Sequence, residues 1–165
     1  MKKTEHQNVL KIVKRSPNDG QATDEVLTLP QDLRQRGRLK ALTDSGVQVG
    51  LFLERGQPLK HGELLLTECG KRITVNAAHE EVATATAENW LTFSRVCYHL
   101  GNRHVPLQIG DCWLRFKSDH VLEAMVENFG LSIHHEQAPF EPESGAYANA
   151  ASADHGHHHH DHHHH

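Results

Sequence analysis

Residues 90–104 read WLTFSRVCYHLGNRH, and this stretch decides how the second half of the chain folds. Apolar side chains recur in it at the three- and four-residue spacing of one helix face. They are Trp90, Phe93, Cys97 and Leu100, with Leu91 and Val96 widening the face. Gly101 and Asn102 follow the last of them, where a left-handed helix cap is expected. The stretch therefore predicts one amphipathic helix that ends near Gly101.

Strand patterns flank this helix on both sides, and a second amphipathic pattern follows. The predicted elements are strands at 81–87, 105–109, 113–117 and 131–135 and a helix at 119–129. Their order around the first helix is that of the ferredoxin-like βαββαβ arrangement, in which two helices cover one face of a four-stranded antiparallel sheet. We therefore expect a ferredoxin-like domain over residues 79–137.

The first half of the chain has strand patterns and no helical period. Six strands are predicted, at residues 9–13, 25–29, 38–42, 48–53, 63–67 and 72–76. Turn clusters such as residues 16–20 and 43–46 separate them, at intervals of about ten residues. We expect a small all-β domain over residues 1–78, so the whole chain is predicted to be α+β with two domains and a tail.

Composition and charge exclude several classes of protein. The 165 residues carry a formal net charge of −4, whereas a nucleic-acid-binding protein usually has a clustered basic face. No run approaches the ~18 apolar residues of a membrane span, and the polar N-terminus lacks the apolar core of a signal peptide. Cys69, Cys97 and Cys112 are odd in number and widely spaced, which predicts neither a disulfide framework nor a cysteine zinc site. A cytoplasmic protein without nucleic-acid or membrane partners is expected.

Catalytic signatures are absent. The chain has no G-x-S-x-G, H-E-x-x-H or P-loop motif, and no fixed triad that would leave a metal position open for hydrolysis. We therefore expect that the protein is not an enzyme. A basic cluster at residues 32–38 (DLRQRGR) has two interpretations: a solvated loop, which is the commoner case, or a patch that docks a partner.

The C-terminal tail carries the clearest chemistry, because nine of the seventeen histidines lie in its last eleven residues. They are His155, His157, His158, His159, His160, His162, His163, His164 and His165. Residues 138–165 contain two prolines and little to bury, so we expect a flexible tail. Imidazole suits Ni²⁺, Cu²⁺ and Zn²⁺, and a flexible string of imidazoles favours storage or hand-off over catalysis. A purification tag is the alternative, although Gly156 and Asp161 interrupt the run.

Two internal histidines are candidate metal ligands. His104 follows the predicted cap of the first helix, and His120 begins the second helix. One histidine alone more often makes a surface hydrogen bond, but a two-fold dimer axis near His104 would bring two copies to one ion. His134 and His135 point to opposite faces of a strand, so at most one of them can join a given site.

The chain resembles the urease accessory protein UreE family along nearly its whole length. The matching stretches are Leu27–Pro30, DLRQRGR at 32–38, Val49–Leu53, YHLGNRHVPLQI at 98–109, Asp119–Leu122 and PFEPE at 139–143 with a His-rich terminus. The YHLGNRH block followed by PLQI is the most specific of them.

This resemblance implies a nickel metallochaperone: a homodimer that carries Ni²⁺ as cargo and delivers it, with an accessory GTPase and other accessory proteins, to apo-urease. It implies that the N-terminal domain docks other proteins and that His104 binds nickel at the dimer interface. Some relatives carry a His-x-His pair at the second helix, where this chain has Ser118 and His120. Zn²⁺ and Cu²⁺ are also expected to bind in vitro. A general metal buffer and a metal-independent docking module for urease components remain as alternatives.

Overall fold

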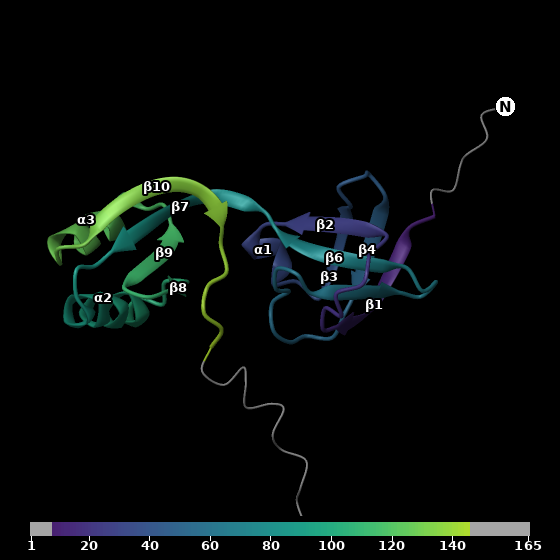
Figure 1. Cartoon of the computed structure of the whole chain (residues 1–165), viewed down its shortest axis with the longest axis horizontal. Helices are drawn as coiled ribbons and strands as arrows, with labels where there is room; N and C mark the ends of the chain where they lie inside the picture. The colour runs from purple at the N-terminus through teal and green to yellow at the C-terminus, as the bar shows by residue number, and fades with distance from the viewer. Residues whose placement is uncertain (1–7, 146–165) are drawn as a thin grey trace, which may run out of the picture.

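The computed structural model describes residues 8–145 and shows two domains side by side (Figure 1). Mixed sheets with few helices make the chain α+β, as the sequence predicts. All six predicted strands of the first half are present. The elements are β1 (Leu10–Ser16), β2 (Glu25–Leu29), α1 (Gln31–Arg34), β3 (Arg38–Leu42), β4 (Gln48–Phe52), β5 (Leu64–Thr67) and β6 (Arg72–Ala77).

These six strands form one mixed sheet in the order β2-β6-β5-β1-β4-β3. β1 runs parallel to β4 and β2 parallel to β6, and the other neighbours are antiparallel. Side chains of β6 alternate between buried and partly exposed, whereas three successive residues of β4 are buried, and burial of apolar surface drives this domain to fold. Its core consists of Ile12, Leu27, Leu29, Val49, Leu51, Leu59, Leu65, Ile73 and Val75.

The helix α1 corrects the expectation of an all-β first half and of a loop at residues 32–38. Pro30 ends β2, and its carbonyl accepts hydrogen bonds from the backbone N–H groups of Leu33 and Arg34. A four-residue helix is too short to leave a periodic signal in the sequence. Arg34 is buried, with 3% of its surface exposed, so this member of the basic cluster is not available to a partner.

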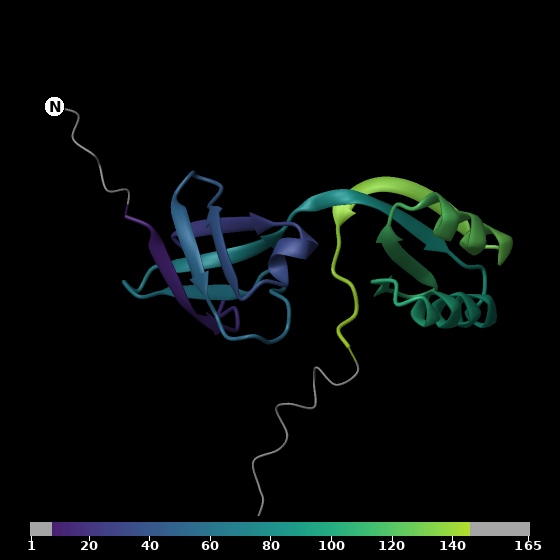
Figure 2. The ribbon, with the colours of Figure 1, turned by 180° about the vertical axis from the view of Figure 1, so that it is seen from behind.

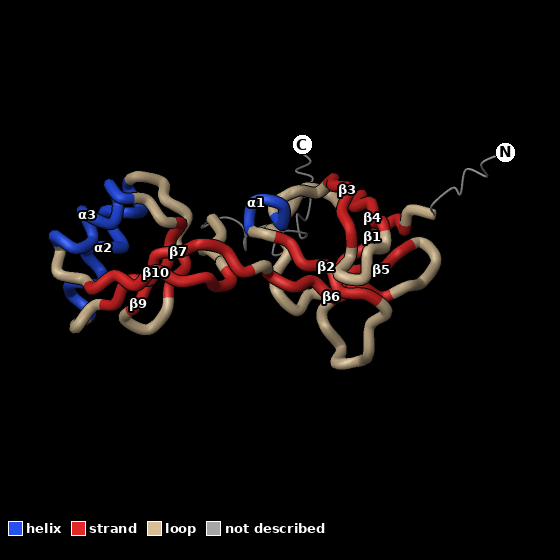
Figure 3. Tube along the Cα trace, turned by 90° about the horizontal axis from the view of Figure 1, so that it is seen from above, coloured by secondary structure: helices blue, strands red, loops and turns tan. Residues whose placement is uncertain are grey.

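The second domain contains the predicted strand and helix order. Its elements are β7 (His79–Thr86), α2 (Trp90–Asn102), β8 (Gln108–Ile109), β9 (Trp113–Lys117), α3 (His120–Asn128) and β10 (Ser132–Pro139). The sheet order is β10-β7-β9-β8 with every pair antiparallel, which is the ferredoxin-like order. Seen from above, α2 and α3 lie on one side of this sheet (Figure 3).

The two helices begin as the sequence predicts, but the end of α2 differs. Asn89 caps α2 by accepting from the N–H of Thr92, and Asp119 caps α3. Gly101 and Asn102 do not form the predicted left-handed cap, because α2 includes both. The left-handed residue is His104, with φ 55°. The predicted apolar face is also narrower: Phe93, Val96 and Leu100 are buried, but Trp90 and Leu91 are more than half exposed.

The strand β10 is longer than the predicted strand at 131–135. It pairs with β7 over eight residues, from Ser132 to Pro139. Phe140 then packs, fully buried, against Val82 and Ala138 on the sheet face opposite the helices. The expectation that order fades after residue 137 is therefore wrong for the segment up to Phe140. The predicted His-rich tail lies outside the described residues.

Several contacts join the two domains. Only Ala78 separates β6 from β7, and its N–H donates to the carbonyl of Leu29 at 2.9 Å. The chain that leaves β10 passes between the domains, as the view from behind shows (Figure 2). We call residues 140–144 the return segment. Within residues 8–145, no helix is both long and apolar enough to cross a membrane.

Candidate functional site

His104 lies two residues beyond the end of α2, in a conformation that few side chains adopt. Its N–H donates to the carbonyl of Gly101 at 3.0 Å, while the N–H of Val105 donates to Leu100 at 3.2 Å. These bonds fix a tight turn that requires φ 55° at His104. A non-glycine residue at positive φ is uncommon, and such residues concentrate at functional sites. The turn holds the exposed imidazole-bearing residue at a defined place beside the domain junction.

A cavity of about 630 Å³ at the domain junction includes His104 in its wall. Both domains and the return segment contribute to this junction cavity. Its lining is Gln31, Arg34, Gln35, Pro58, Leu59, Lys60, His61, His104, Val105, Pro106, Glu141, Pro142, Glu143 and Ser144. The cavity therefore combines two histidines and two carboxylates with basic and apolar groups. Sequence reasoning identified only His104 among these charged and titratable residues as a ligand candidate.

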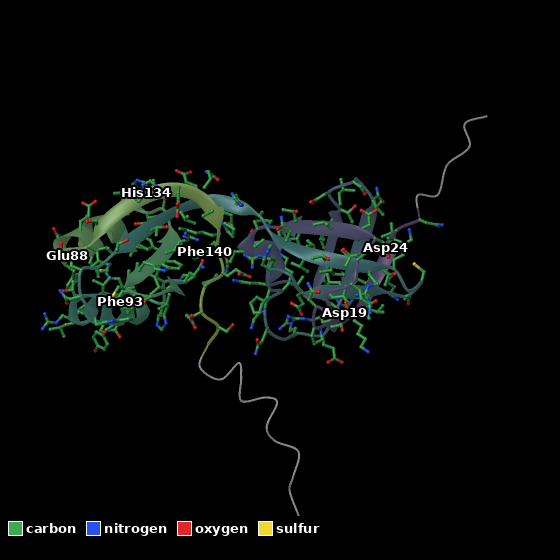
Figure 4. All side chains as sticks on the ribbon, viewed as in Figure 1. Asp19, Asp24, Glu88, Phe93, His134 and Phe140 are labelled. Carbon is green, nitrogen blue, oxygen red and sulfur yellow. The ribbon has the colours of Figure 1, made fainter. Side chains whose placement is uncertain are left out.

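Arg34 holds the return segment against the N-terminal domain. Its guanidinium donates to the carbonyls of Leu29 at 3.1 Å and Leu59 at 3.3 Å, and also to the carbonyl of Phe140. The Glu141 carboxylate lies 3.6 Å away. Burial lowers the pKa of Arg34, and the charges of Glu141 and Glu80 oppose that shift. Phe140 lies where the two domains meet (Figure 4).

The return segment is also bonded to both domains through its own polar groups. The Glu141 carboxylate accepts from the N–H of His61 at 2.7 Å, and the N–H of Glu141 donates to the side chain of Gln108 at 3.0 Å. The N–H of Glu143 donates to Leu107 at 2.8 Å. These bonds bring His61 and the two glutamates to the cavity that contains His104. The only sequence signal for the two glutamates was the PFEPE stretch of the family resemblance, and no sequence signal pointed to His61.

His120 lies elsewhere, as the exposed first residue of α3. The Asp119 carboxylate accepts from the backbone N–H groups of Val121 and Leu122, and the Glu123 carboxylate accepts from the N–H of Asp119 at 3.1 Å. Glu123 also contacts the ring of His135 at 2.9 Å. His134 lies on the opposite face of β10, 3.9 Å from Glu136, so the predicted opposition of the two histidines is confirmed.

Within the described range 8–145, one chain brings no group of three His, Cys, Asp or Glu side chains together in metal-binding geometry. His104 and His120 are thus separate candidates. The nine tail histidines predicted as ligands lie outside the described residues. The described residues of one chain therefore supply too few donors beside His104 for a coordination sphere made of protein ligands alone, since transition metals take four or more ligands.

Two family models match the chain, one for each domain. The N-terminal domain model of the UreE urease accessory protein covers residues 7–78, and the C-terminal domain model covers residues 80–165. The two matches meet near Ala78, the residue that separates β6 from β7.

Individual relatives agree with these models. A urease accessory protein UreE of Alteromonas mediterranea is 58% identical over 127 residues, which are 77% of this chain and 82% of that protein. That of Psychromonas ingrahamii is 52% identical, over 84% of this chain and 91% of the relative, and that of Vibrio parahaemolyticus is 48% identical, over 79% and 83%. The chain belongs to the UreE urease accessory protein family.

Proposed function

We propose that this UreE protein is a nickel metallochaperone. As a urease accessory protein it has a role in urease maturation. The proposal is that it binds Ni²⁺ as cargo in the cytoplasm. It passes the ion, together with an accessory GTPase and other accessory proteins, to apo-urease, and it performs no catalysis itself.

The observation that carries this proposal is the placement of His104. The residue is exposed, held in a left-handed turn, and lies on the wall of a cavity between two domains. A histidine whose backbone is fixed in this way presents its imidazole to a borderline metal such as Ni²⁺ at low entropic cost. One chain offers no second and third ligand beside it within residues 8–145. We therefore propose a homodimer in which two copies of His104 share one ion.

The proposed tail histidines play a different part. We expect the nine tail histidines to bind several ions weakly, because many imidazoles on one chain act together. Imidazole binds a metal only when it is neutral, so nickel is expected to leave the tail as the pH falls through the ordinary histidine pKa near ~6.5. Zn²⁺ and Cu²⁺ compete in vitro, because affinity for such donors rises from Ni²⁺ to Cu²⁺.

Equilibrium dialysis against nickel at neutral pH tests the proposal. The full chain should bind several ions. Deletion of residues 155–165 should leave about one tight ion per dimer, because the proposed two-fold interface brings one pair of His104 residues together. His104→Ala in the shortened chain should remove that ion, whereas His79→Ala, an exposed control, should not. If His104→Ala leaves nickel binding unchanged, the core site is wrongly assigned.

The alternative functions give different results in the same samples. A metal buffer loses its nickel with the tail and is indifferent to His104→Ala. A metal-independent docking module captures urease components equally well with a chelator present. The metallochaperone proposal instead requires that activation of apo-urease depends on bound nickel and on His104.

A further inference from the structure

Three arginines of the N-terminal domain surround a surface pocket that is separate from the His104 site. The pocket has a volume of about 560 Å³. It is lined by Gln35, Arg36, Gly37, Arg38, Leu53, Arg55 and Gly56. All three arginines are exposed, in contrast to the buried Arg34 of the same sequence cluster.

Gly37 explains how these arginines come together. The N–H of Leu53 donates to the carbonyl of Gly37 at 2.9 Å. A Cβ added at Gly37 would lie 2.8 Å from the Leu53 carbonyl oxygen, a distance that real Cβ atoms essentially never show. Only glycine lets the two backbones approach this closely. The Arg-Gly-Arg sequence therefore sets Arg36 and Arg38 directly beside the segment that carries Arg55.

The positive charges of this pocket are not neutralised within the described part of the chain. Arg36, Arg55 and the nearby Lys40 form no ion pair there, and the contact of Arg38 is with the ring of Phe52, 6.0 Å from its centroid. Four other arginines are paired with carboxylates: Arg15, Arg34, Arg72 and Arg115. Glu54, next to Arg55 in the sequence, is exposed and makes no ion pair with these groups.

An aromatic ring, that of Phe52, lies beside the pocket and is approached by two cations, Arg38 and Lys11. Arg38 of β3 lies opposite Phe52 of β4 in the sheet register, and Lys40 lies opposite Gly50. The Phe52 ring extends over Gly50, because a Cβ there would lie 3.1 Å from Phe52 Cε2. The ring is 48% exposed although it is large and apolar. We call Arg36, Arg38, Lys40, Phe52 and Arg55 the basic face.

We propose that the basic face binds an acidic segment of a partner protein, with carboxylates on the arginines and an apolar side chain on Phe52. Guanidinium groups bind carboxylates through paired hydrogen bonds, and arginine and aromatic side chains are enriched at the energetic centres of interfaces. Arg38 lines the pocket and also contacts the exposed Phe52 ring, so an occupant that reaches both is an extended chain rather than a small anion. This inference rests on the expectation, drawn from the family resemblance, that the N-terminal domain docks other proteins.

Fluorescence anisotropy of the full chain with a labelled peptide of alternating glutamate and leucine tests the inference. The variant Arg36→Glu/Arg55→Glu should weaken binding by about tenfold or more, because two carboxylate contacts become repulsive. The control Lys71→Glu/Arg95→Glu makes the same change in net charge at exposed positions outside the face, and should change the affinity by less than about twofold. Phe52→Ala should also weaken binding, and thermal unfolding checks that each variant is folded.

Three results would overturn the inference: unchanged affinity in Arg36→Glu/Arg55→Glu, an equal loss in the control, or displacement of the peptide by inorganic phosphate at similar concentration. The last result would assign the pocket to phosphate instead. Nickel dialysis of the same samples separates the two proposals. A wild-type chain that binds no nickel contradicts the proposed function, whereas unchanged peptide affinity contradicts only the basic face.

Discussion

At the scale of single residues, Arg34 joins the two domains through one buried cation. It donates to carbonyls of β2, of the segment before β5 and of the return segment. Arg34→Met should lower the free energy of unfolding by about 3 kcal/mol, because it leaves these buried carbonyls without their donor and removes the cation beside the Glu141 carboxylate. Urea unfolding measures the loss. The matched control Arg36→Met, at an exposed position of the same motif, should change stability by less than about 0.5 kcal/mol. Equal effects of the two substitutions would contradict the assigned role.

Substitutions at His104 can separate two roles of this residue: its backbone conformation affects the free energy of unfolding, and its imidazole is the proposed nickel ligand. At φ 55°, His104→Val should lower the free energy of unfolding by about 1–2 kcal/mol, because a β-branched side chain is strained in the left-handed region. His104→Asn should be close to neutral, because asparagine tolerates this conformation. Denaturant unfolding gives both values, and nickel dialysis should show the same loss of the core ion in both variants. If valine is as well tolerated as asparagine, the turn is not as described.

At the scale of elements, the return segment is fixed by Phe140. Phe140 is fully buried against Val82 and Ala138, so Phe140→Ala should cost about 3–5 kcal/mol through the cavity it leaves. Phe52→Ala, at a half-exposed ring, should cost much less. Comparison of the two denaturant midpoints tests the prediction. A small effect at Phe140 would mean that the segment is not packed in solution.

Glu136 on β10 makes the free energy of unfolding depend on pH in the acid range. A hydrogen bond from Thr84 and the charge of Arg115 lower the pKa of Glu136 below its ordinary value of 4.5. A lowered pKa in the folded state contributes stability that is present above pH 4.5 and is lost as the pH falls through the folded pKa. Glu136→Gln should therefore show a weaker loss of stability on acidification below pH 4.5 than the wild type. Unfolding at a series of pH values measures this. The exposed control Glu127→Gln should follow the wild-type curve.

Local patterns predicted some elements well and others not at all. Strand patterns at 25–29 and 113–117 and the helical spacing from Trp90 to Leu100 are local features, and the structure confirms these elements. Burial of Arg34 and Phe140 depends on contacts between residues 106 positions apart in the sequence, which no window of local pattern contains. The Trp90 ring fits the helical spacing but is 57% exposed, because spacing does not show where the packed face ends.

At the scale of the whole molecule, the two domains line one cavity. The junction cavity takes its wall from both domains and from the return segment, and His104 lies at its edge. The position of His104 after the first predicted helix made it a candidate metal ligand. The family resemblance added the expectation that it binds nickel at a dimer interface. The cavity itself could not be predicted, because it exists only when β6 continues into β7 and the return segment folds back between the domains. Within the described residues, one chain has no group of three metal ligands. The proposed nickel site is therefore one that two chains share.

Native mass spectrometry of the chain shortened by residues 155–165, with nickel added, tests this central claim most directly. The account predicts a species of two chains with one nickel ion, and its loss in His104→Ala. A shortened chain that remains monomeric with nickel present, or that binds one ion per single chain, would contradict it.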